Sequence, residues 1–182
     1  MSRRGLLLIA AALALVILVG STGFLIAKKA TSYSPTIPAG YNVFTSPDKS
    51  FRIAYPSDWQ VSDAGAGTGV RFEGPAHQVV IVTTVAGLTD DPASIDSAFC
   101  QGQGGNGGFG GSASSPKTVS IGGQSWTQEE CDTGDQSGHA AVAALTYQGN
   151  SYLLTYASPK ASFNSNQRTF FSPIEGSFQF LK

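Results

Sequence analysis

Two histidines, His77 and His139, are the only side chains here whose ordinary pKa lies near neutral pH, so any histidine-based catalysis depends on them. His77 falls in an expected turn, and His139 begins an expected strand. A serine nucleophile beside one of them would be Ser57 or Ser137. Neither serine lies in G-x-S-x-G or another nucleophile motif. We therefore predict two surface histidines and no catalytic residue.

The densest group of carboxylates is Glu129, Glu130, Asp132 and Asp135. Carboxylate oxygens are what calcium requires, but the D-x-[DN]-x-[DN]-G spacing of an EF-hand is absent. The sequence favours a solvated end of a hairpin, with a weak cation site as the alternative. We predict no metal site and no cofactor.

Residues 102–107, GQGGNG, formally satisfy the G-x-G-x-x-G pattern of a dinucleotide-binding loop. The pattern follows an expected helix instead of a strand, and no lysine lies nearby to hold a phosphate. The whole stretch 102–115 is almost entirely glycine, serine and asparagine. It is typical of a flexible loop that cannot form a packed element.

Cys100 and Cys131 are the only cysteines. In a domain exported to an oxidising compartment, an even number of cysteines favours a disulfide. Closing a loop of about 30 residues would stabilise the fold by roughly 3.5 to 4 kcal/mol in the chain-entropy model. Two buried free thiols and two metal ligands are the alternatives, and zinc is disfavoured because neither cysteine has a second ligand at C-x-x-C spacing.

The N-terminal residues 5–27 carry no charge and are apolar except for Ser21 and Thr22. A helix of this length would reach roughly 35 Å, enough to cross a bilayer. We predict a membrane anchor over 1–27, an extended tether with two prolines over 28–40, and one extracytoplasmic domain over 41–182. The alternative is a cleaved signal peptide and a secreted domain.

The charge of the domain differs from that of the whole chain, which has a formal net charge of −1. Arg3, Arg4, Lys28 and Lys29 flank the apolar segment. The remainder keeps 7 of the 11 basic residues against all 12 acidic ones, a net charge of −5. Such a domain has no phosphate-neutralising surface, so we predict that it does not bind nucleic acid.

The domain reads as a series of strands with two helices. Alternating and β-branched runs predict strands over 41–45, 51–55, 70–73, 79–85, 117–121, 124–132, 139–147 and 151–156. Turns at Gly122-Gly123 and at 148–150 predict that the last four of these strands form two hairpins. Asp91-Pro92 predicts the start of a helix that ends near Gln101. A second helix is expected over 162–172, because Pro173 should kink or end its regular part. This pattern predicts an α+β domain built around an antiparallel sheet.

Two motifs in this domain resemble those of a known family. The run Phe44-Thr45-Ser46-Pro47-Asp48, with Phe51-x-Ile53-x-Tyr55-Pro56-x-x-Trp59, resembles the opening of PsbP-like domains. The run Phe171-x-x-Ile174-x-x-Ser177-Phe178 resembles their ending. The resemblance covers most of 41–182 and implies an α/β/α sandwich around an antiparallel sheet, shared by a photosystem II subunit, a Ran-binding nuclear import factor and bacterial exported lipoproteins. These are packing residues, so they carry over a fold and no site.

The sequence therefore favours a membrane-tethered, extracytoplasmic PsbP-like module that acts by binding a protein partner or a membrane complex. Loop or exposed apolar residues such as Phe109 would carry that binding. The competing hypothesis is an extracytoplasmic enzyme, such as a hydrolase, whose site is assembled across loops. An enzyme requires titratable side chains that converge in one pocket, and a binding module does not.

We predict that residues 5–27 remain in the mature protein as its membrane anchor, because the run is long and lacks a good cleavage site. N-terminal sequencing of the mature protein should find a start before this run. A start anywhere after Val19 would contradict the prediction and indicate secretion.

Overall fold

The computed structural model describes residues 33–64, 69–86, 91–102 and 109–181. The expected anchor, 5–27, lies outside these residues and stays a prediction. Within the described part of the chain, no helix is both long enough and apolar enough to span a membrane. Residues Tyr33–Lys182 form one compact unit. It begins earlier than expected because the Tyr33 hydroxyl donates to the Gly176 carbonyl and its ring contacts Gly123.

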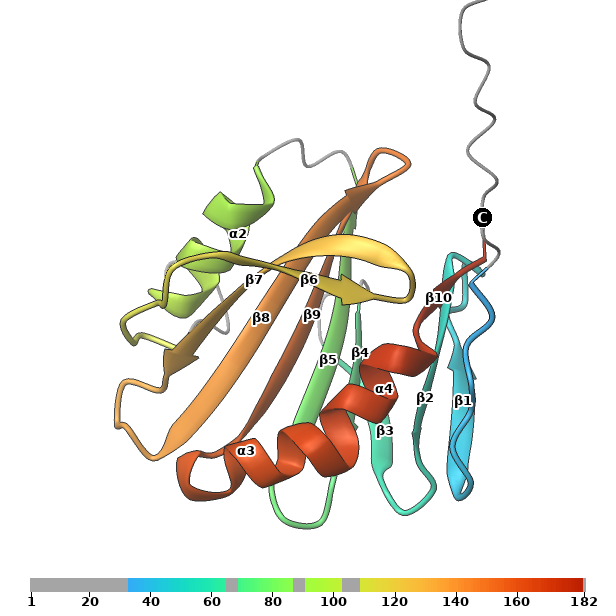
Figure 1. The fold of residues 1–182 in the computed structure, drawn as a ribbon, viewed down its shortest axis with the longest axis horizontal. Helices are drawn as coiled ribbons and strands as arrows, with labels where there is room; N and C mark the ends of the chain where they lie inside the picture. The colour runs from blue at the N-terminus through green and yellow to red at the C-terminus, as the bar shows by residue number, and fades with distance from the viewer. Residues whose placement is uncertain (1–32, 65–68, 87–90, 103–108, 182) are drawn as a thin grey trace, which may run out of the picture. The chain divides into compact units, whose positions relative to one another are not determined.

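Two antiparallel sheets contain all of the described strands (Figure 1). The small sheet has the order β1-β2-β10 and the large sheet the order β3-β4-β5-β9-β8-β7-β6. The small sheet is built from β1 (Tyr41–Thr45), β2 (Phe51–Pro56) and β10 (Gln179–Phe180). The large sheet is built from β3 (Gln60–Asp63), β4 (Gly69–Glu73), β5 (Val79–Ala86), β6 (Lys117–Ile121), β7 (Gln124–Asp132), β8 (Gly138–Tyr147) and β9 (Asn150–Pro159).

Two-residue turns fix the register of the central hairpins. Gly122 and Gly123 join β6 to β7, and both have positive φ, at 59° and 74°. Gln148 and Gly149 join β8 to β9 in the same way, at 50° and 79°. Such turns match the right-handed twist of the strands that they connect. The predicted hairpins are confirmed, and β8 pairs with β9 over the full length of both strands.

The large sheet is buried on both faces, and β8 shows this most clearly. All five residues from Ala140 to Ala144 are buried. Ala141 and Ala143 belong to the main core, whereas Ala140, Val142 and Ala144 belong to a second core with Cys100 of helix α2 (Pro92–Cys100). The helices thus cover opposite faces of the large sheet, as Figure 1 shows. The predicted antiparallel α+β fold is confirmed.

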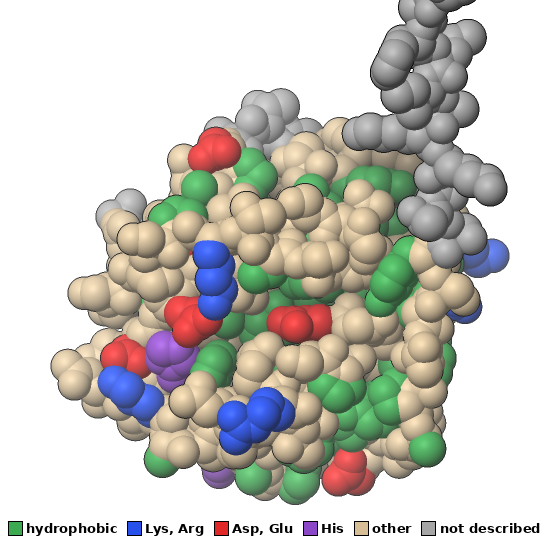
Figure 2. Space-filling model, in the orientation of Figure 1, with side chains coloured by type: hydrophobic (Ala, Val, Ile, Leu, Met, Phe, Trp, Pro, Cys, Tyr) green, Lys and Arg blue, Asp and Glu red, His purple; other side chains and the backbone are tan. Residues whose placement is uncertain are grey.

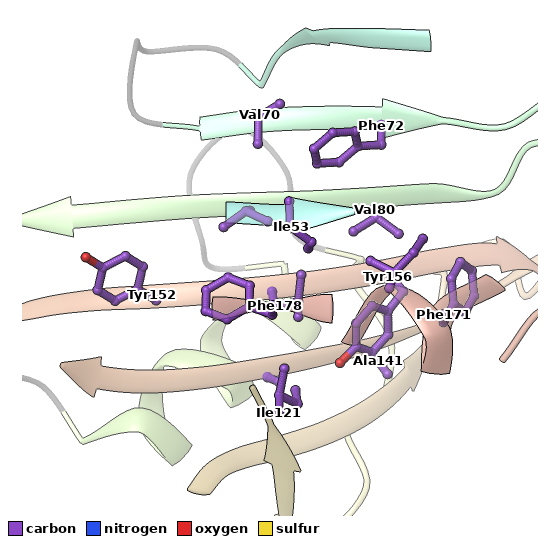
Figure 3. Close-up of a cluster of buried hydrophobic side chains, with 14 of the residues drawn as sticks. Ile53, Val70, Phe72, Val80, Ile121, Ala141, Tyr152, Tyr156, Phe171 and Phe178 are labelled. Carbon is purple, nitrogen blue, oxygen red and sulfur yellow. The ribbon is translucent and has the colours of Figure 1, made fainter. Parts of the chain in front are cut away.

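The main core lies between the large sheet, the small sheet and the C-terminal helical segment (Figure 3). Ile53 of β2, Phe72 of β4 and Phe171 of the C-terminal segment are each fully buried. Phe178 stacks on Phe51 with ring centroids 5.5 Å apart. Most of the motif residues that resemble PsbP-like domains are therefore packing residues, as expected, whereas Thr45, Pro47 and Asp48 are exposed.

The C-terminal helical segment is longer than predicted. It contains a 3₁₀ turn (Lys160–Ser162), α3 (Phe163–Asn166), a π-helical turn (Gln167–Phe171) and α4 (Ser172–Ser177). The prediction that Pro173 ends the helix is wrong. The wider π turn precedes the proline, which lies in the first turn of α4, where its missing N–H costs little. The Tyr41 hydroxyl lies 3.5 Å from the Thr169 carbonyl, four residues before Pro173.

Two other predictions need correction. Strand β3 was not predicted, because all four of its residues are exposed and no apolar alternation marks it. The stretch 102–115 was predicted to be a flexible loop without a packed element, and its residues 103–108 lie outside the described part. Phe109 nevertheless packs edge-on against Phe99 at 5.7 Å, and Ala113 forms a bridge with Cys131. Phe109 is therefore a partly buried core residue and not an exposed binding residue.

The predicted disulfide between Cys100 and Cys131 is present, with the two Cα atoms 5.7 Å apart. It joins the last residue of α2 to β7. Both cysteines are buried in the second core. Gly111 lies against this junction, where an added Cβ would come within 1.9 Å of the Asp132 carbonyl oxygen.

Trp59 is the core anchor that the sequence predicted, with 5% of its surface exposed. Its ring lies 5.6 Å from that of Phe170 and against Gly74. We expect Trp59→Ala to lower the free energy of unfolding by about 3 to 5 kcal/mol, because it removes a buried aromatic ring and leaves a cavity. Urea denaturation followed by circular dichroism measures the loss. The control Val43→Ala, on the exposed face of β1, should change the free energy of unfolding by less than about 0.5 kcal/mol.

Candidate functional site

A charged network surrounds His139 near the start of β8. Figure 2 shows basic, acidic and histidine side chains beside one another on one face of the domain. Its Nδ1 lies 2.7 Å from Asp132 Oδ1, and its Nε2 lies 3.3 Å from Glu130 Oε2. Lys160 donates to Asp132 at 2.6 Å, and Lys117 donates to Glu130. Both imidazole nitrogens therefore face carboxylates, and neither is aimed at a serine.

These partners change the acidity of the two carboxylates. Hydrogen bonds from His139 and Lys160 lower the pKa of Asp132. Burial acts to raise the pKa of Glu130, but hydrogen bonds from Lys117 and His139 outweigh it, and the pKa is lowered. Both carboxylates are charged at neutral pH. Ion pairs as exposed as these contribute little to stability, because water screens the two charges.

The other predicted candidates are not brought together. His77 lies in the β4–β5 turn with a φ of 60°. Ser137 donates its hydroxyl to Asp135 at 2.9 Å, and Asp135 also accepts from Thr133, so this carboxylate organises the β7–β8 turn. Hydrogen bonds lower the pKa of Asp135. Among the described residues, no three His, Cys, Asp or Glu side chains are arranged to hold a metal ion.

Glu129 contradicts the prediction of a solvated carboxylate cluster, because only 1% of its surface is exposed. It lies on the face of β7 that α2 covers, and Ser97 of that helix donates to its Oε1 at 2.6 Å. Asp96 of α2 is fully buried, and no side chain among the described residues is hydrogen-bonded to its carboxylate. Burial, reinforced by Glu129, raises the pKa of Asp96 to about 8. Asp96 is therefore largely protonated at neutral pH.

A second pair of titratable groups, Glu175 and Tyr156, was not anticipated from the sequence. Tyr156 of β9 is fully buried and hydrogen-bonded to Glu175 of α4, and Gln128 donates to its hydroxyl at 3.3 Å. Burial raises the pKa of both groups. A carboxyl with a raised pKa is suited to acid–base chemistry, but here it also ties α4 to the large sheet.

A pocket of about 660 Å³ opens between the small sheet and the large sheet. The β1–β2 turn and parts of β1, β2, β3, β4, β5 and β9 line it. Its apolar lining consists of Phe44, Pro47, Phe51, Val61 and Val70. Its polar lining consists of Ser46, Asp48, Ser62, Asp63, Thr84 and Asn150, with Gly69 beside them. Volumes of 300 to 1,000 Å³ are typical of small-molecule sites.

Hydrogen bonds hold the β1–β2 turn that forms one wall of this pocket. The buried Ser46 hydroxyl accepts from the amides of Ser50 at 2.9 Å and Phe51 at 3.1 Å. Asp48 Oδ1 accepts from the Ser50 amide at 3.1 Å and from its hydroxyl at 2.9 Å. The wall is therefore formed in advance of any ligand. The sequence could not reveal this pocket, because its walls come from six strands and a turn spread over more than 100 residues.

No protein-family model matches the chain, and no curated protein matches it by sequence. Several solved structures match it by their fold. Cyanobacterial PsbP (CyanoP) from Synechocystis sp. PCC 6803 has a TM-score of 0.57 and 16% identity, over 79% of this chain and 94% of that chain. The chain has the PsbP/Mog1p fold.

The Ran-binding protein Mog1p of Saccharomyces cerevisiae shares this PsbP/Mog1p fold, with a TM-score of 0.51 and 9% identity over 82% of this chain and 97% of that chain. A protein of Bacteroides thetaiotaomicron matches with a TM-score of 0.52 and 16% identity, over 79% of this chain and 49% of that chain. The resemblance to PsbP-like domains is confirmed. At these identities the likeness establishes the fold and assigns no site.

Two signals in the sequence could have revealed the buried carboxylates. Asp96 lies four residues before Cys100 on a helix, and Glu129 lies two residues before Cys131 on a strand. Each spacing places the carboxylate on the same face as a cysteine. The predicted disulfide therefore implied that both carboxylates enter the second core of the PsbP/Mog1p fold.

Asp96 makes stability depend on pH. Between about pH 4 and pH 8 the folded protein keeps a proton that the unfolded chain releases, so the free energy of unfolding falls as pH rises, by up to about 1.4 kcal/mol per pH unit. Asp96→Asn should flatten this decline and make the protein more stable than wild type above pH 7. Urea denaturation at a series of pH values from 4 to 9 measures the free energy of unfolding of both proteins.

The matched control for this prediction is Glu73→Gln, which changes a partly exposed carboxylate paired with Arg71. It should keep the wild-type pH dependence. Identical slopes for wild type and Asp96→Asn would contradict a buried, protonated Asp96.

Proposed function

We propose that this chain is a membrane-tethered, extracytoplasmic accessory module that acts by binding, and that the pocket between its two sheets is the binding site. The pocket is the observation that carries the proposal. It combines a volume suited to a ligand with buried apolar walls and a hydrogen-bonded turn. Pre-formed concave sites of this composition bury most of the surface of what they bind.

The location in this proposal rests on the sequence. The apolar run 5–27 and the proline-containing residues 28–40 would hold the domain close to the extracytoplasmic surface of the membrane. The Cys100–Cys131 disulfide agrees with an oxidising compartment. The net charge of −5 calculated for the domain argues against nucleic acid as the partner.

A protein or a membrane complex is the partner that we propose for the module as a whole, and the pocket binds a small ligand within that assembly. Mog1p, which has this fold, is named as a Ran-binding protein. That name describes Mog1p, and it supports our proposal only by showing that the fold is compatible with protein binding.

The enzyme hypothesis has a narrower basis. Its best acid–base candidate is Glu175 with Tyr156, because burial raises the pKa of both groups. Neither residue lines the pocket, and both ring nitrogens of His139 lie beside carboxylates. The binding hypothesis needs only the pocket, which is why we prefer it.

Photocrosslinking in the native membrane tests the proposed function. A photoreactive amino acid replaces Val61, which lines the pocket and is 41% exposed, so the substitution leaves the core intact. We expect a discrete adduct, whose mass distinguishes a protein from a small molecule. The matched control replaces Val43, which is 48% exposed on β1 and does not line the pocket. No adduct at position 61, or the same adducts at both positions, would contradict the pocket as the binding site.

A further inference from the structure

The two charged residues of the pocket lining are exposed, whereas part of its apolar lining is buried. Phe51 and Val70, which are 4% and 5% exposed, form an apolar floor to which Phe44 adds an aromatic ring. The side chains of Asp48 and Asp63, by contrast, belong to exposed residues. A ligand that fills this pocket therefore needs an apolar body, which the floor would cover, and a polar end at the rim.

The charge at the rim has one sign. Asp48 comes from the β1–β2 turn and Asp63 from the end of β3, so the two carboxylates stand on separate walls. Among the described residues that line the pocket, none is Lys, Arg or His. Lys49 follows Asp48 in the turn but is not part of the lining. The pocket therefore favours a cation and disfavours a carboxylate or phosphate.

The structure holds these carboxylates in place. Asp48 accepts two hydrogen bonds from Ser50, which fix the orientation of its side chain. Asp48 and Asp63 also interact with other groups of the chain, so a ligand would add its contacts to carboxylates that the chain already orients. Orientation before binding reduces the entropy lost when a charged ligand is captured.

From these observations we infer that the pocket binds a small molecule with an apolar body and a positively charged amine at one end. The inference rests on the proposed function, because it names the ligand class of the same pocket. The apolar body lies on Phe44, Phe51 and Val70, and the ammonium group lies between the walls that carry Asp48 and Asp63.

Three probes of matched shape test this ligand class. Tryptamine, tryptophol and indole-3-propionate share an indole ring and a two-carbon chain, and they end in an ammonium, a hydroxyl and a carboxylate. Equilibrium dialysis against the full-length chain in zwitterionic lipid nanodiscs gives the three dissociation constants. We expect tryptamine to bind about 3- to 10-fold tighter than tryptophol and at least 10-fold tighter than indole-3-propionate, and the preference to shrink in 1 M salt.

Substitutions test whether the probes bind in the pocket and whether its two carboxylates cause the preference for an ammonium group. Asp48→Asn keeps an oxygen that can accept from Ser50, and Asp63→Asn changes an exposed residue, so both variants keep the fold. Each variant should weaken the binding of tryptamine about threefold and leave the binding of tryptophol unchanged. Asp58→Asn, an exposed aspartate outside the pocket lining, should change neither. Val61→Trp should block all three probes, whereas Val43→Trp should block none.

The outcomes separate the ligand class from the proposed function. If Val61→Trp removes binding but the three probes bind equally, or indole-3-propionate binds best, the pocket is a binding site and the amine class is wrong. If tryptamine binding survives Val61→Trp, or if no probe binds at millimolar concentration, the pocket assignment fails together with the ligand class. Loss of the tryptamine preference in Asp48→Asn and Asp63→Asn, but not in Asp58→Asn, supports the inference.

Discussion

The need to cover both faces of one antiparallel sheet governs this structure. Strand β8 lies near the middle of the large sheet, and its five consecutive buried residues leave no face for water. Four of the five are alanines, so the layers can approach the strand closely from either side. Helix α2 and the disulfide cover one face, while the small sheet and the C-terminal segment cover the other. At the β3 end, the small sheet and the large sheet leave the pocket between them.

The sequence predicted most of the elements of this fold, because their signals are local. Alternation in 51–55 and the β-branched run 79–85 marked two strands, and Gly122-Gly123 marked a hairpin. The end of the C-terminal helix was misplaced, because a single π turn changes where a proline can be accommodated. Strand β3 gave no signal, since it is held by pairing with β4 and buries none of its side chains. Local sequence patterns do not predict an element whose position is set by strand pairing or by backbone geometry.

The candidate sites were predicted less well, because they depend on which face of an element is covered. Glu129 sits in a run of polar residues that is typical of a solvated hairpin end, yet strand alternation turns it toward α2. Tyr156 and Glu175 lie 19 residues apart in the chain, and their side chains meet only in the folded domain. The pocket has no counterpart in any single stretch of sequence. Among the predicted candidates, His139 and Asp132 are hydrogen-bonded to each other, and their charged network lies at the start of β8.

The disulfide also sets the covalent topology of the chain. Cys100 and Cys131 enclose all the residues from Gln101 to Glu130, including the glycine-rich stretch. A protease that cuts once inside this interval leaves both halves in one covalent molecule, with β8, β9 and the C-terminal segment still attached to α2. The domain can therefore lose the continuity of its backbone there without releasing a fragment until the disulfide is reduced.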